Sequence, residues 1–295
     1  MNINFKIHNP NHIVKNILGN IEYAFPHLGL QKNELTVVNY HGTQKKFLNN
    51  FRKQIDFFQK EFFIISPHQL NDFYSGKLVH DSLPLLLLTF DDGVKNNLYA
   101  INELESRGIK AFFFVIPDFI NTPKDKQKDF FIRNIRPEIN YGIDDKEEDF
   151  IAMSWDDLKT LQVKGHCIGS HTQTHTLITR QSTLENSIIE IKDSKVNIAN
   201  ALTSPLTLTN SFCSINNTLE SISSKEVSLI KENYQYHFTT IPGFNIPSSN
   251  PYYIKRANIE SHWLSGSVKF ALGKWDLKRW EKVDKRFLRI LENVL

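Results

Sequence analysis

The stretch that decides the fold is PLLLLTFDDG, at residues 84–93. Its first seven residues form a continuous apolar run with the length of a buried strand, which stops at two acidic residues and a glycine. Residues 95–107 have the apolar spacing of an amphipathic helix, and residues 110–116 (KAFFFVI) form a second buried strand. This order of strand, helix and strand is a βαβ unit. Continuous apolar strands of this kind predict a parallel sheet that is covered on both faces.

The rest of the chain continues the alternation of strands and helices. Further strands are expected at residues 34–40, 61–65, 165–169, 206–211, 235–240 and 252–259, and further helices at 45–60, from Ser154 onward and at 182–200. No linker divides these elements, so we expect a single domain that forms a barrel of α/β type.

We expect three segments in this organisation. Residues 1–33 are an N-terminal extension, residues 34–266 form the barrel, and residues 267–295 are a C-terminal helical segment that packs on the barrel. A polar insertion at 121–150, rich in Lys, Asp and Glu, interrupts the barrel. It has two interpretations, a solvated surface excursion or a lid that faces the substrate.

Composition excludes several classes of protein. Hydrophobic residues make up 40% of the 295 residues and charged residues 23%, which excludes a wholly disordered chain. Lys+Arg 35 against Asp+Glu 32 leaves a net charge of +3, too balanced for a nucleic-acid binder. No apolar run of about 18 residues is present, so a membrane-spanning helix is not expected. Two cysteines cannot form a disulfide framework, and the first 30 residues lack a signal-peptide pattern, so we expect a cytoplasmic location.

Two clusters of residues can carry chemistry. Asp91 and Asp92 are adjacent carboxylates at the end of a buried strand, where a cationic group must offset their repulsion. The alternative is an ordinary tight turn or helix cap. His171 and His175 are four residues apart, which places them on one face of a helical turn where they can bind one metal ion. The alternative here is two polar loop histidines.

The two clusters together are more specific than either alone. In a parallel α/β barrel, the C-terminal ends of all strands meet at one rim. One Asp and two His at that rim provide three protein ligands and leave an open coordination position, which is the layout of a catalytic zinc site. The other Asp is then free to act as a base.

These motifs resemble the polysaccharide deacetylases of carbohydrate esterase family four, also called the NodB-homology family. The similar stretches include TFDDG at 89–93, the strand KAFFFVI, and MSWDDLKTLQVKGHCIGSHTQTH at 153–175. The resemblance covers roughly residues 34–260. It implies a distorted (β/α) barrel and the metal-dependent removal of acetyl groups from amino sugars.

The resemblance also implies roles for individual residues. Asp91 matches the catalytic base of the family, and Asp92, His171 and His175 match its metal ligands. We expect one divalent metal, with Zn²⁺ as the ion. Arg256 resembles an arginine of one branch of the family and is expected to orient Asp91 through a bidentate contact. A surface salt bridge is the alternative for Arg256.

The chain departs from the family pattern after the long helix. The family usually has a proline and an aromatic residue there, often preceded by arginine, whereas residues 211–217 (SFCSINN) contain neither Pro nor Arg. This leaves open which group holds the oxyanion. A backbone N–H near Cys213 or Ser214 can serve, so both residues are expected at the substrate site.

The general acid has no clear equivalent in this sequence. His262 is our candidate, with His41 and His237 as alternatives, and for each a structural or surface role competes. His41 is also a candidate for substrate binding. Trp155 either packs in the core or stacks on a sugar ring.

The leading hypothesis is a metal-dependent hydrolase that removes N-acetyl groups from an amino sugar in a polysaccharide or glycan precursor. Its expected partner is an acetylated carbohydrate and not a nucleic acid. Two alternatives stay open, an O-acetyl esterase or amidase with the same metal site, and a non-catalytic carbohydrate-binding relative. The sequence does not predict the oligomeric state.

Overall fold

The computed structural model describes residues 10–24, 32–78, 80–137, 146–203, 210–216 and 224–273. Parts of several expected segments therefore lie outside the described residues: the N-terminal extension, the polar insertion at 121–150, the strand at 206–211, the stretch 211–217 and the C-terminal segment at 267–295.

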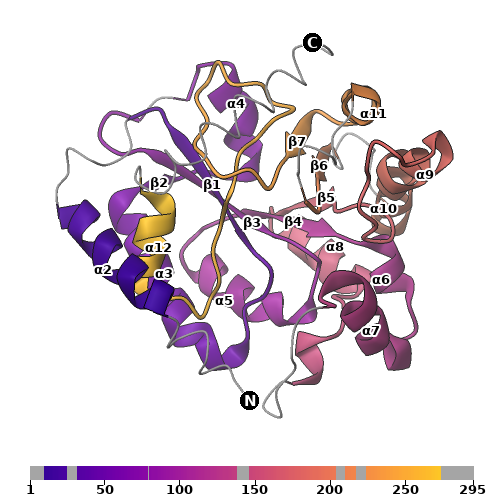
Figure 1. Ribbon diagram of the computed structural model, residues 1–295, viewed down its shortest axis with the longest axis horizontal. Helices are drawn as coiled ribbons and strands as arrows, with labels where there is room; N and C mark the ends of the chain where they lie inside the picture. The colour runs from indigo at the N-terminus through magenta and orange to yellow at the C-terminus, as the bar shows by residue number, and fades with distance from the viewer. Residues whose placement is uncertain are drawn as a thin grey trace.

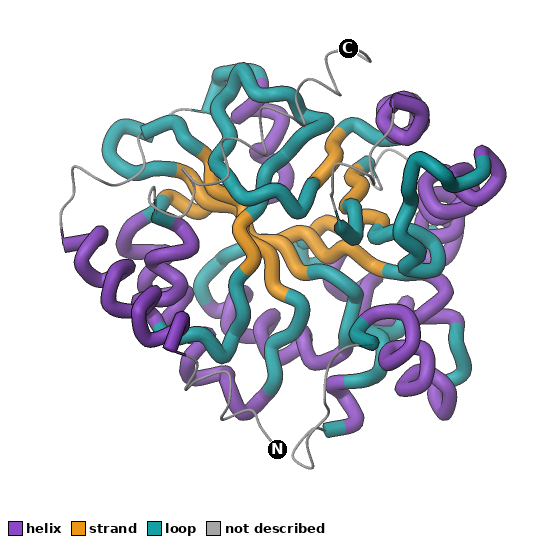
Figure 2. The backbone as a smooth tube through the Cα atoms, in the orientation of Figure 1, coloured by secondary structure: helices purple, strands orange, loops and turns teal. Residues whose placement is uncertain are grey.

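A curled parallel sheet forms the centre of the molecule (Figures 1 and 2). Its strands lie in the order β7-β6-β5-β4-β3-β1-β8, and β2 pairs with β3 as well. The strands are β1 (Leu35–Tyr40), β2 (Phe63–Ile64), β3 (Leu85–Phe90), β4 (Ala111–Val115), β5 (Cys167–Ser170), β6 (Ser211–Cys213), β7 (Tyr236–Phe238) and β8 (Ala257–Asn258). Each of these ladders is parallel. The expected α/β class and distorted (β/α) barrel are confirmed.

The segment between β7 and β8 connects the two edge strands of the sheet, and the gap between these strands is the seam of the barrel. Phe238 forms a parallel bridge to Ile254, and Leu35 forms an antiparallel bridge to Asn245. The strand expected at 252–259 is reduced to its last part, because other groups take its backbone N–H donors. Lys255 N donates to Asn245 Oδ1 (2.9 Å), and Arg256 N donates to Ile241 O (2.9 Å).

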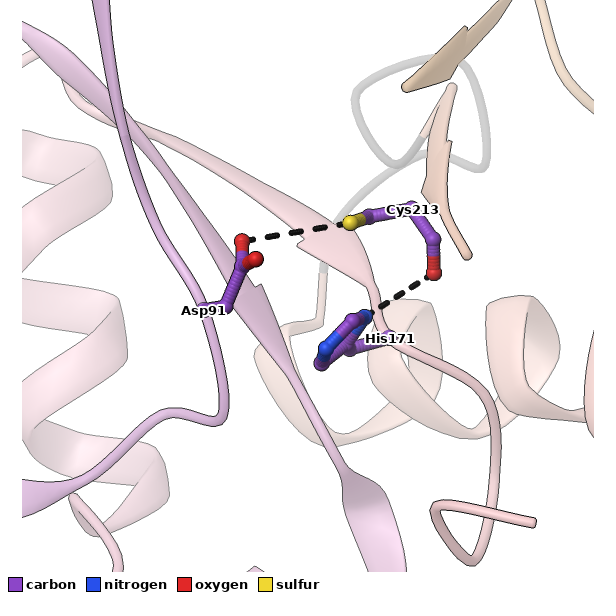
Figure 3. Close-up of side chains that lie close together, drawn as sticks. All are labelled: Asp91, His171 and Cys213. Atoms are coloured by element: carbon purple, nitrogen blue, oxygen red, sulfur yellow. Dashed lines mark hydrogen bonds between the residues drawn. The ribbon is translucent and has the colours of Figure 1, made fainter. Parts of the chain in front are cut away.

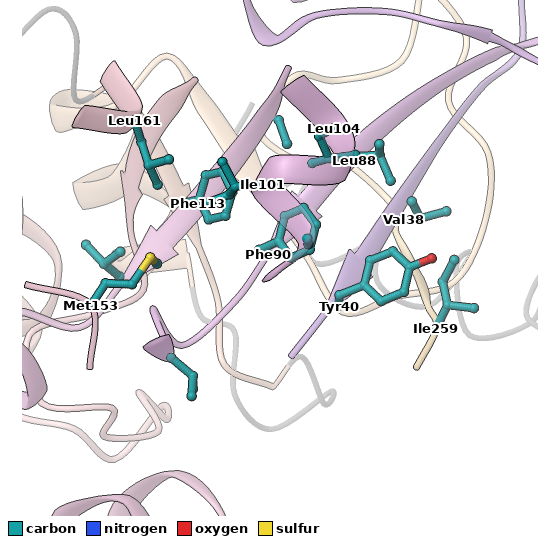
Figure 4. Packing of buried hydrophobic residues seen from close by; sticks show 14 of the residues in the cluster. Val38, Tyr40, Leu88, Phe90, Ile101, Leu104, Phe113, Met153, Leu161 and Ile259 are labelled. Carbon is teal, nitrogen blue, oxygen red and sulfur yellow. The ribbon is translucent and has the colours of Figure 1, made fainter. Parts of the chain in front are cut away.

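Two hydrophobic cores lie on the two faces of β3, because side chains alternate along a strand. Leu86, Leu88 and Phe90 pack on the outer face under the surrounding helices (Figure 4). Leu85 and Leu87 belong to a second cluster that includes residues of β4, β6 and β7 and fills the barrel. Asp91 is two residues after Thr89, so its side chain faces the barrel interior like those of Leu85 and Leu87. It lies at the rim, directly after the end of β3.

Helices cover the sheet and complete the alternation. The main ones are α3 (Leu48–Glu61), α4 (Leu70–Tyr74), α5 (Leu98–Ser106), α8 (Trp155–Val163), α9 (Leu184–Ile188), α10 (Ser194–Leu202) and α11 (Ser224–Asn233). A π-helical turn, η7 (Ile189–Asp193), joins α9 to α10, so the helix expected at 182–200 is one helical run with a π turn inside it. Helix α8 begins as expected, with a capping box between Ser154 and Asp157.

The described part of the polar insertion is helical. It forms α6 (Pro117–Asn121), α7 (Lys124–Phe130) and a second π-helical turn, η5 (Phe131–Ile135). Phe131 and Ile135 are buried in the outer core, which anchors this segment against the barrel. Residues 124–135 are therefore helical and not a loop, although most side chains of α7 are exposed, as expected for a surface excursion. The spacing of Phe130, Phe131 and Ile135 is the signal that could have revealed a helix.

The two end segments of the described chain pack together. Helix α2 (Pro10–Ala24) lies beside α12 (Ser265–Leu272), next to α3 (Figure 1). Gly19 and Gly266 lie at the crossing, where a Cβ on Gly19 would collide with the Gly266 carbonyl oxygen. Among the described helices, none combines the length and the apolar character needed to cross a membrane.

Candidate metal centre and active site

The two adjacent carboxylates lie in a tight turn directly after β3. Asp91 is 2% exposed and Asp92 is 1% exposed. Asp92 and Gly93 both adopt left-handed backbone conformations, with φ of 68° and 66°. Glycine is needed at position 93, because a Cβ there would be strained and would lie only 3.1 Å from Val115 Cγ1. The turn allows the two carboxylates to have different partners.

Asp91 is held by a buried arginine. Arg256 Nη1 donates to Asp91 Oδ1 over 2.8 Å, and Asn39 Nδ2 lies 3.4 Å from Asp91 Oδ2. Burial by itself would raise the pKa of Asp91, but the Arg256 guanidinium lowers this pKa below its usual value. The contact is single and not bidentate as expected, because Arg256 Nε donates to Thr239 O instead. With its side chain fully buried, Arg256 does not form a surface salt bridge.

Asp92 faces the two histidines. Asp92 Oδ1 lies 3.5 Å from His171 Nε2 and 3.4 Å from His175 Nε2. Each ring is oriented through its other nitrogen, since His171 Nδ1 bonds to Cys213 O (2.9 Å) and His175 Nδ1 bonds to Asn134 O (2.7 Å). The three side chains therefore present one carboxylate oxygen and two Nε2 atoms to a common point.

The four-residue spacing of the histidines suggested a helical turn, but the loop that carries them is not helical. Residues 171–175 follow β5 as an irregular turn in which Thr172 and His175 have positive φ values of 68° and 65°. These conformations bring the rings to a centroid distance of 5.3 Å. The two histidine rings therefore lie close together as expected, but a loop with left-handed residues holds them, not a helix.

This cluster fits a divalent metal ion. The ligand atoms of Asp92, His171 and His175 all lie within 4.8 Å of one another. Donors bound to one tetrahedral zinc at about 2.0–2.2 Å are about 3.3–3.5 Å apart, which agrees with the separations from Asp92. Asp92 Oδ2 is buried without a hydrogen-bond partner among the described residues. Histidines whose Nδ1 atoms are held by carbonyl groups are typical of metal ligands.

Residues 80–225 match the family model described as polysaccharide deacetylase. The chain carries a polysaccharide deacetylase domain. The family resemblance expected from the sequence is thereby confirmed, and members of this family are deacetylase hydrolases. No curated protein sequence matches the chain.

Solved structures of other deacetylases share the fold of this domain. The Streptococcus pyogenes deacetylase PplD, solved in complex with acetate, superposes with a TM-score of 0.60 at 16% identity, over 79% of this chain and 95% of that one. IcaB from Ammonifex degensii gives a TM-score of 0.59 at 19% identity, over 83% and 99% of the two chains. The BpsB deacetylase domain from Bordetella bronchiseptica gives 0.59 at 18% identity, over 77% and 96%.

Cys213 lies between Asp91 and the candidate metal ligand His171. Its thiol points toward Asp91, with Sγ 3.9 Å from Asp91 Oδ1, while its carbonyl oxygen accepts from His171 (Figure 3). Burial raises the pKa of the Cys213 thiol, so it is protonated at neutral pH. Asp91, His171 and Cys213 form a second possible ligand group. Its sulfur is already engaged with Asp91, and we favour the first group.

Ser214 and His237 form a hydrogen-bonded pair at the neighbouring strand ends. Ser214 Oγ lies 2.6 Å from His237 Nε2, and His237 Nδ1 lies 3.1 Å from Tyr252 O. Burial lowers the pKa of His237 to about 4, so its ring is neutral at pH 7. The pair borders a cavity of about 20 Å³. Ser214 N donates to Phe238 O (3.0 Å), so this N–H cannot also hold an oxyanion.

The other candidate histidines lie beyond β1 and β8. His41 follows β1 directly, is about one quarter exposed, and places Nδ1 3.3 Å from Glu260 Oε1. Asp91 N donates to the carbonyl oxygen of Tyr40 (2.8 Å), the residue before His41, so His41 lies near the two carboxylates. The ring of His262 instead packs 5.6 Å from the ring of Phe47, outside both ligand groups.

Two further residues complete the surroundings of the site. Trp155 packs against the outer core and donates from Nε1 to Asn121 Oδ1 (2.9 Å), contacts that favour the packing role. Arg136, from the polar insertion, places Nη2 3.8 Å from Asp92 Oδ2. Sequence reasoning missed Arg136, because the insertion was not recognised as a helix that reaches the rim.

Proposed function

We propose that the chain is a metal-dependent deacetylase that removes an N-acetyl group from an amino sugar in a polysaccharide or glycan precursor. One observation carries this proposal. A carboxylate held by a buried arginine, Asp91, lies beside a separate cluster of Asp92, His171 and His175 that fits a metal ion. A hydrolase of this type needs both parts, a base and a ligand set, and needs them adjacent but distinct.

In this proposal, Asp92, His171 and His175 hold one divalent ion, with zinc as the expected ion. When bound, such an ion supplies Lewis acidity, which polarises the acetyl carbonyl and makes a water molecule more acidic. Asp91 then takes a proton from the attacking water. Its Oδ1 accepts from Arg256 over 2.8 Å, whereas Oδ2 has the longer 3.4 Å contact with Asn39 Nδ2, so Oδ2 is the atom that receives the proton. Arg256 keeps the carboxylate ionised and fixes its direction.

The leaving nitrogen must be protonated as the C–N bond breaks, because an amide anion is a very poor leaving group. Among the three candidate histidines, we propose His41 for this step. His237 is buried, with both ring nitrogens bonded, and His262 packs on Phe47. His41 is partly exposed at the rim, and its bond to Glu260 through Nδ1 leaves Nε2 to give the proton. The products are acetate and a free amine.

Acetate release by the zinc-loaded protein tests the proposed function. The substrates are N-acetylglucosamine oligomers and, in parallel, O-acetylated sugars. We expect release from the N-acetyl compounds, and we expect Asp91→Asn to abolish it while the metal stays bound. Release from O-acetyl compounds alone would establish the esterase alternative. No release from any compound by the fully loaded wild-type protein would favour a carbohydrate-binding relative. The cytoplasmic location remains a prediction.

A further inference from the structure

The loop between the two histidines depends on an outside anchor. Thr172 and His175 both have left-handed backbone conformations, which non-glycine residues adopt only when their surroundings impose them. Within the loop, His175 N donates to Thr172 Oγ1 (3.0 Å). A single internal hydrogen bond does not fix five residues, so the direction of the His175 ring has to be set from elsewhere.

Glu190 is the main outside anchor, and Asp118 N adds one hydrogen bond to Gln173 O (3.1 Å). The Glu190 carboxylate is buried, with the residue 5% exposed. Oε2 accepts from both Gln173 N (2.9 Å) and Thr174 N (3.0 Å), and Oε1 accepts from Thr174 Oγ1 (2.7 Å). All three donors belong to the two residues immediately before His175. The carboxylate therefore binds the backbone of the loop, not a distant surface group.

The π-helical turn explains how Glu190 reaches the loop. Glu190 is the second residue of η7, and the wider turn of a π-helix re-aims side chains relative to a regular α-helix. The second π-helical turn, η5, contains Asn134, whose carbonyl oxygen accepts from His175 Nδ1. Glu190 thus fixes the backbone before His175, and Asn134 fixes its ring.

We infer that Glu190 is a positioning residue for the metal ligand His175, an inference that rests on the proposed metal site of Asp92, His171 and His175. An ionised carboxylate accepts at both oxygens and has no hydrogen to donate. A glutamine of the same shape can keep its oxygen on the two N–H groups and donate from NH₂ to Thr174 Oγ1, but its hydrogen bonds to Gln173 N and Thr174 N are then neutral, and neutral bonds are roughly half as strong as those to a carboxylate. Glu190→Gln therefore loosens the loop without creating a cavity.

Zinc affinity provides a test that does not depend on activity. The dissociation constant for Zn²⁺ is measured by competition with a chromophoric chelator, for wild type, Glu190→Gln and Glu105→Gln. Glu105 is the matched control, because it also accepts hydrogen bonds from a histidine and a lysine, His166 and Lys110, but not at the metal cluster. We expect Glu190→Gln to weaken zinc binding about 10–100-fold, the usual cost of removing a group that supports a ligand. We expect Glu105→Gln to stay within about twofold of wild type.

Thermal unfolding of the metal-free proteins separates positioning from stability. Both variants are expected to lower Tm, and only Glu190→Gln is expected to change zinc affinity. Equal zinc affinity of Glu190→Gln and wild type would overturn the inference and leave the proposed function intact. A wild-type protein that binds no zinc would overturn both. If Glu190→Gln does not fold, Thr174→Val removes the hydroxyl bond to Glu190 Oε1 together with the contact to Thr176 Oγ1, keeps both N–H bonds to Glu190, and should weaken zinc binding by a smaller factor, with Thr176→Val as the control for the Thr176 contact. Unchanged affinity in Thr174→Val would then count against the inference.

Discussion

Arg256 donates a hydrogen bond to Asp91 across 2.8 Å, and the side chains of both residues are shielded from solvent. The two residues come from opposite ends of the domain, since Asp91 follows β3 and Arg256 precedes β8 at the seam of the barrel. A buried carboxylate of this kind is stable only with its counter-charge. Closure of the barrel therefore brings Arg256 to Asp91 and keeps the proposed base ionised.

Removing Arg256 alone should destabilise the protein strongly. Arg256→Met leaves the Asp91 carboxylate buried and uncompensated, so we expect the free energy of unfolding to fall by about 3–5 kcal/mol. The double variant Asp91→Asn/Arg256→Met should lose less than the sum of the single variants, with a coupling energy of about 1–3 kcal/mol. Urea denaturation of the four proteins gives the complete cycle. Strictly additive losses would mean that the two side chains do not stabilise each other.

The metal content should depend on the histidine pair. We expect the variant His171→Ala/His175→Ala to retain almost no zinc after desalting, because one carboxylate is a weak site by itself. His68→Ala is the control, since His68 is an exposed histidine outside the cluster. Elemental analysis gives the zinc content per chain. A double variant with wild-type zinc content would place the metal at another site.

Loss of the proposed acid, His41, should affect substrates with an amine leaving group more than substrates with an alcohol leaving group. We expect His41→Ala to lower kcat on an N-acetylated sugar by about 10²–10⁴-fold, with unchanged zinc content. The loss should be smaller on an O-acetyl ester, because an alcohol leaves more readily than an amine. His262→Ala, measured in parallel, is expected to keep most of its activity. A larger loss in His262→Ala than in His41→Ala would return the role to His262.

Stability in acid should depend on His166, which precedes β5, whereas His171 follows the other end of that strand. Burial lowers the pKa of His166 to about 4, and Ala111 N donates to its Nδ1, so the folded protein holds it neutral. The unfolded chain, with an ordinary pKa near 6.5, takes up the proton first as the pH falls. Stability is therefore complete above about pH 6.5 and is lost between about pH 6.5 and 4, by an amount on the order of 3 kcal/mol.

The variant His166→Gln isolates this contribution, because glutamine can accept from Ala111 N but does not titrate. Its free energy of unfolding, measured with urea at pH 7 and at pH 4.5, should fall less than that of wild type between the two values. His237, whose pKa is also lowered to about 4, remains in both proteins and contributes equally. The same pH dependence in both proteins would show that His166 is not the titrating group.

The sequence predicts the parts of this molecule that are encoded locally. The apolar runs of β3 and β4 and the cap at Ser154 need only their own residues, and each was found where expected. The short strands β6 and β8 were not bounded correctly, because their limits are set by pairing with distant segments. The helical form of the insertion was missed because its charged residues mask the spacing of its buried ones.

The candidate site also has features that the sequence predicts and features that distant segments determine. Residue types and their spacing suffice to bring one Asp and two His to a common rim, because parallel strand ends share it, and the family resemblance chooses Asp92 over Asp91 as the ligand. The conformation of the histidine loop was expected to be helical, and it is set instead by left-handed residues and by Glu190. Support from the carbonyl oxygens of Asn134 and Cys213 has no sequence signature, since every residue carries such a group.

The contact between α2 and α12 has a consequence for synthesis on the ribosome. Helix α12 is made roughly 240 residues after α2, which takes about 12–50 s at ordinary rates of translation. Throughout that interval, the surface around Gly19 that α12 will cover has no partner, and Ile13 and Ile17 add further apolar area beside it. Until α12 is made, this surface of α2 is therefore open to other apolar surfaces, those of chaperones included.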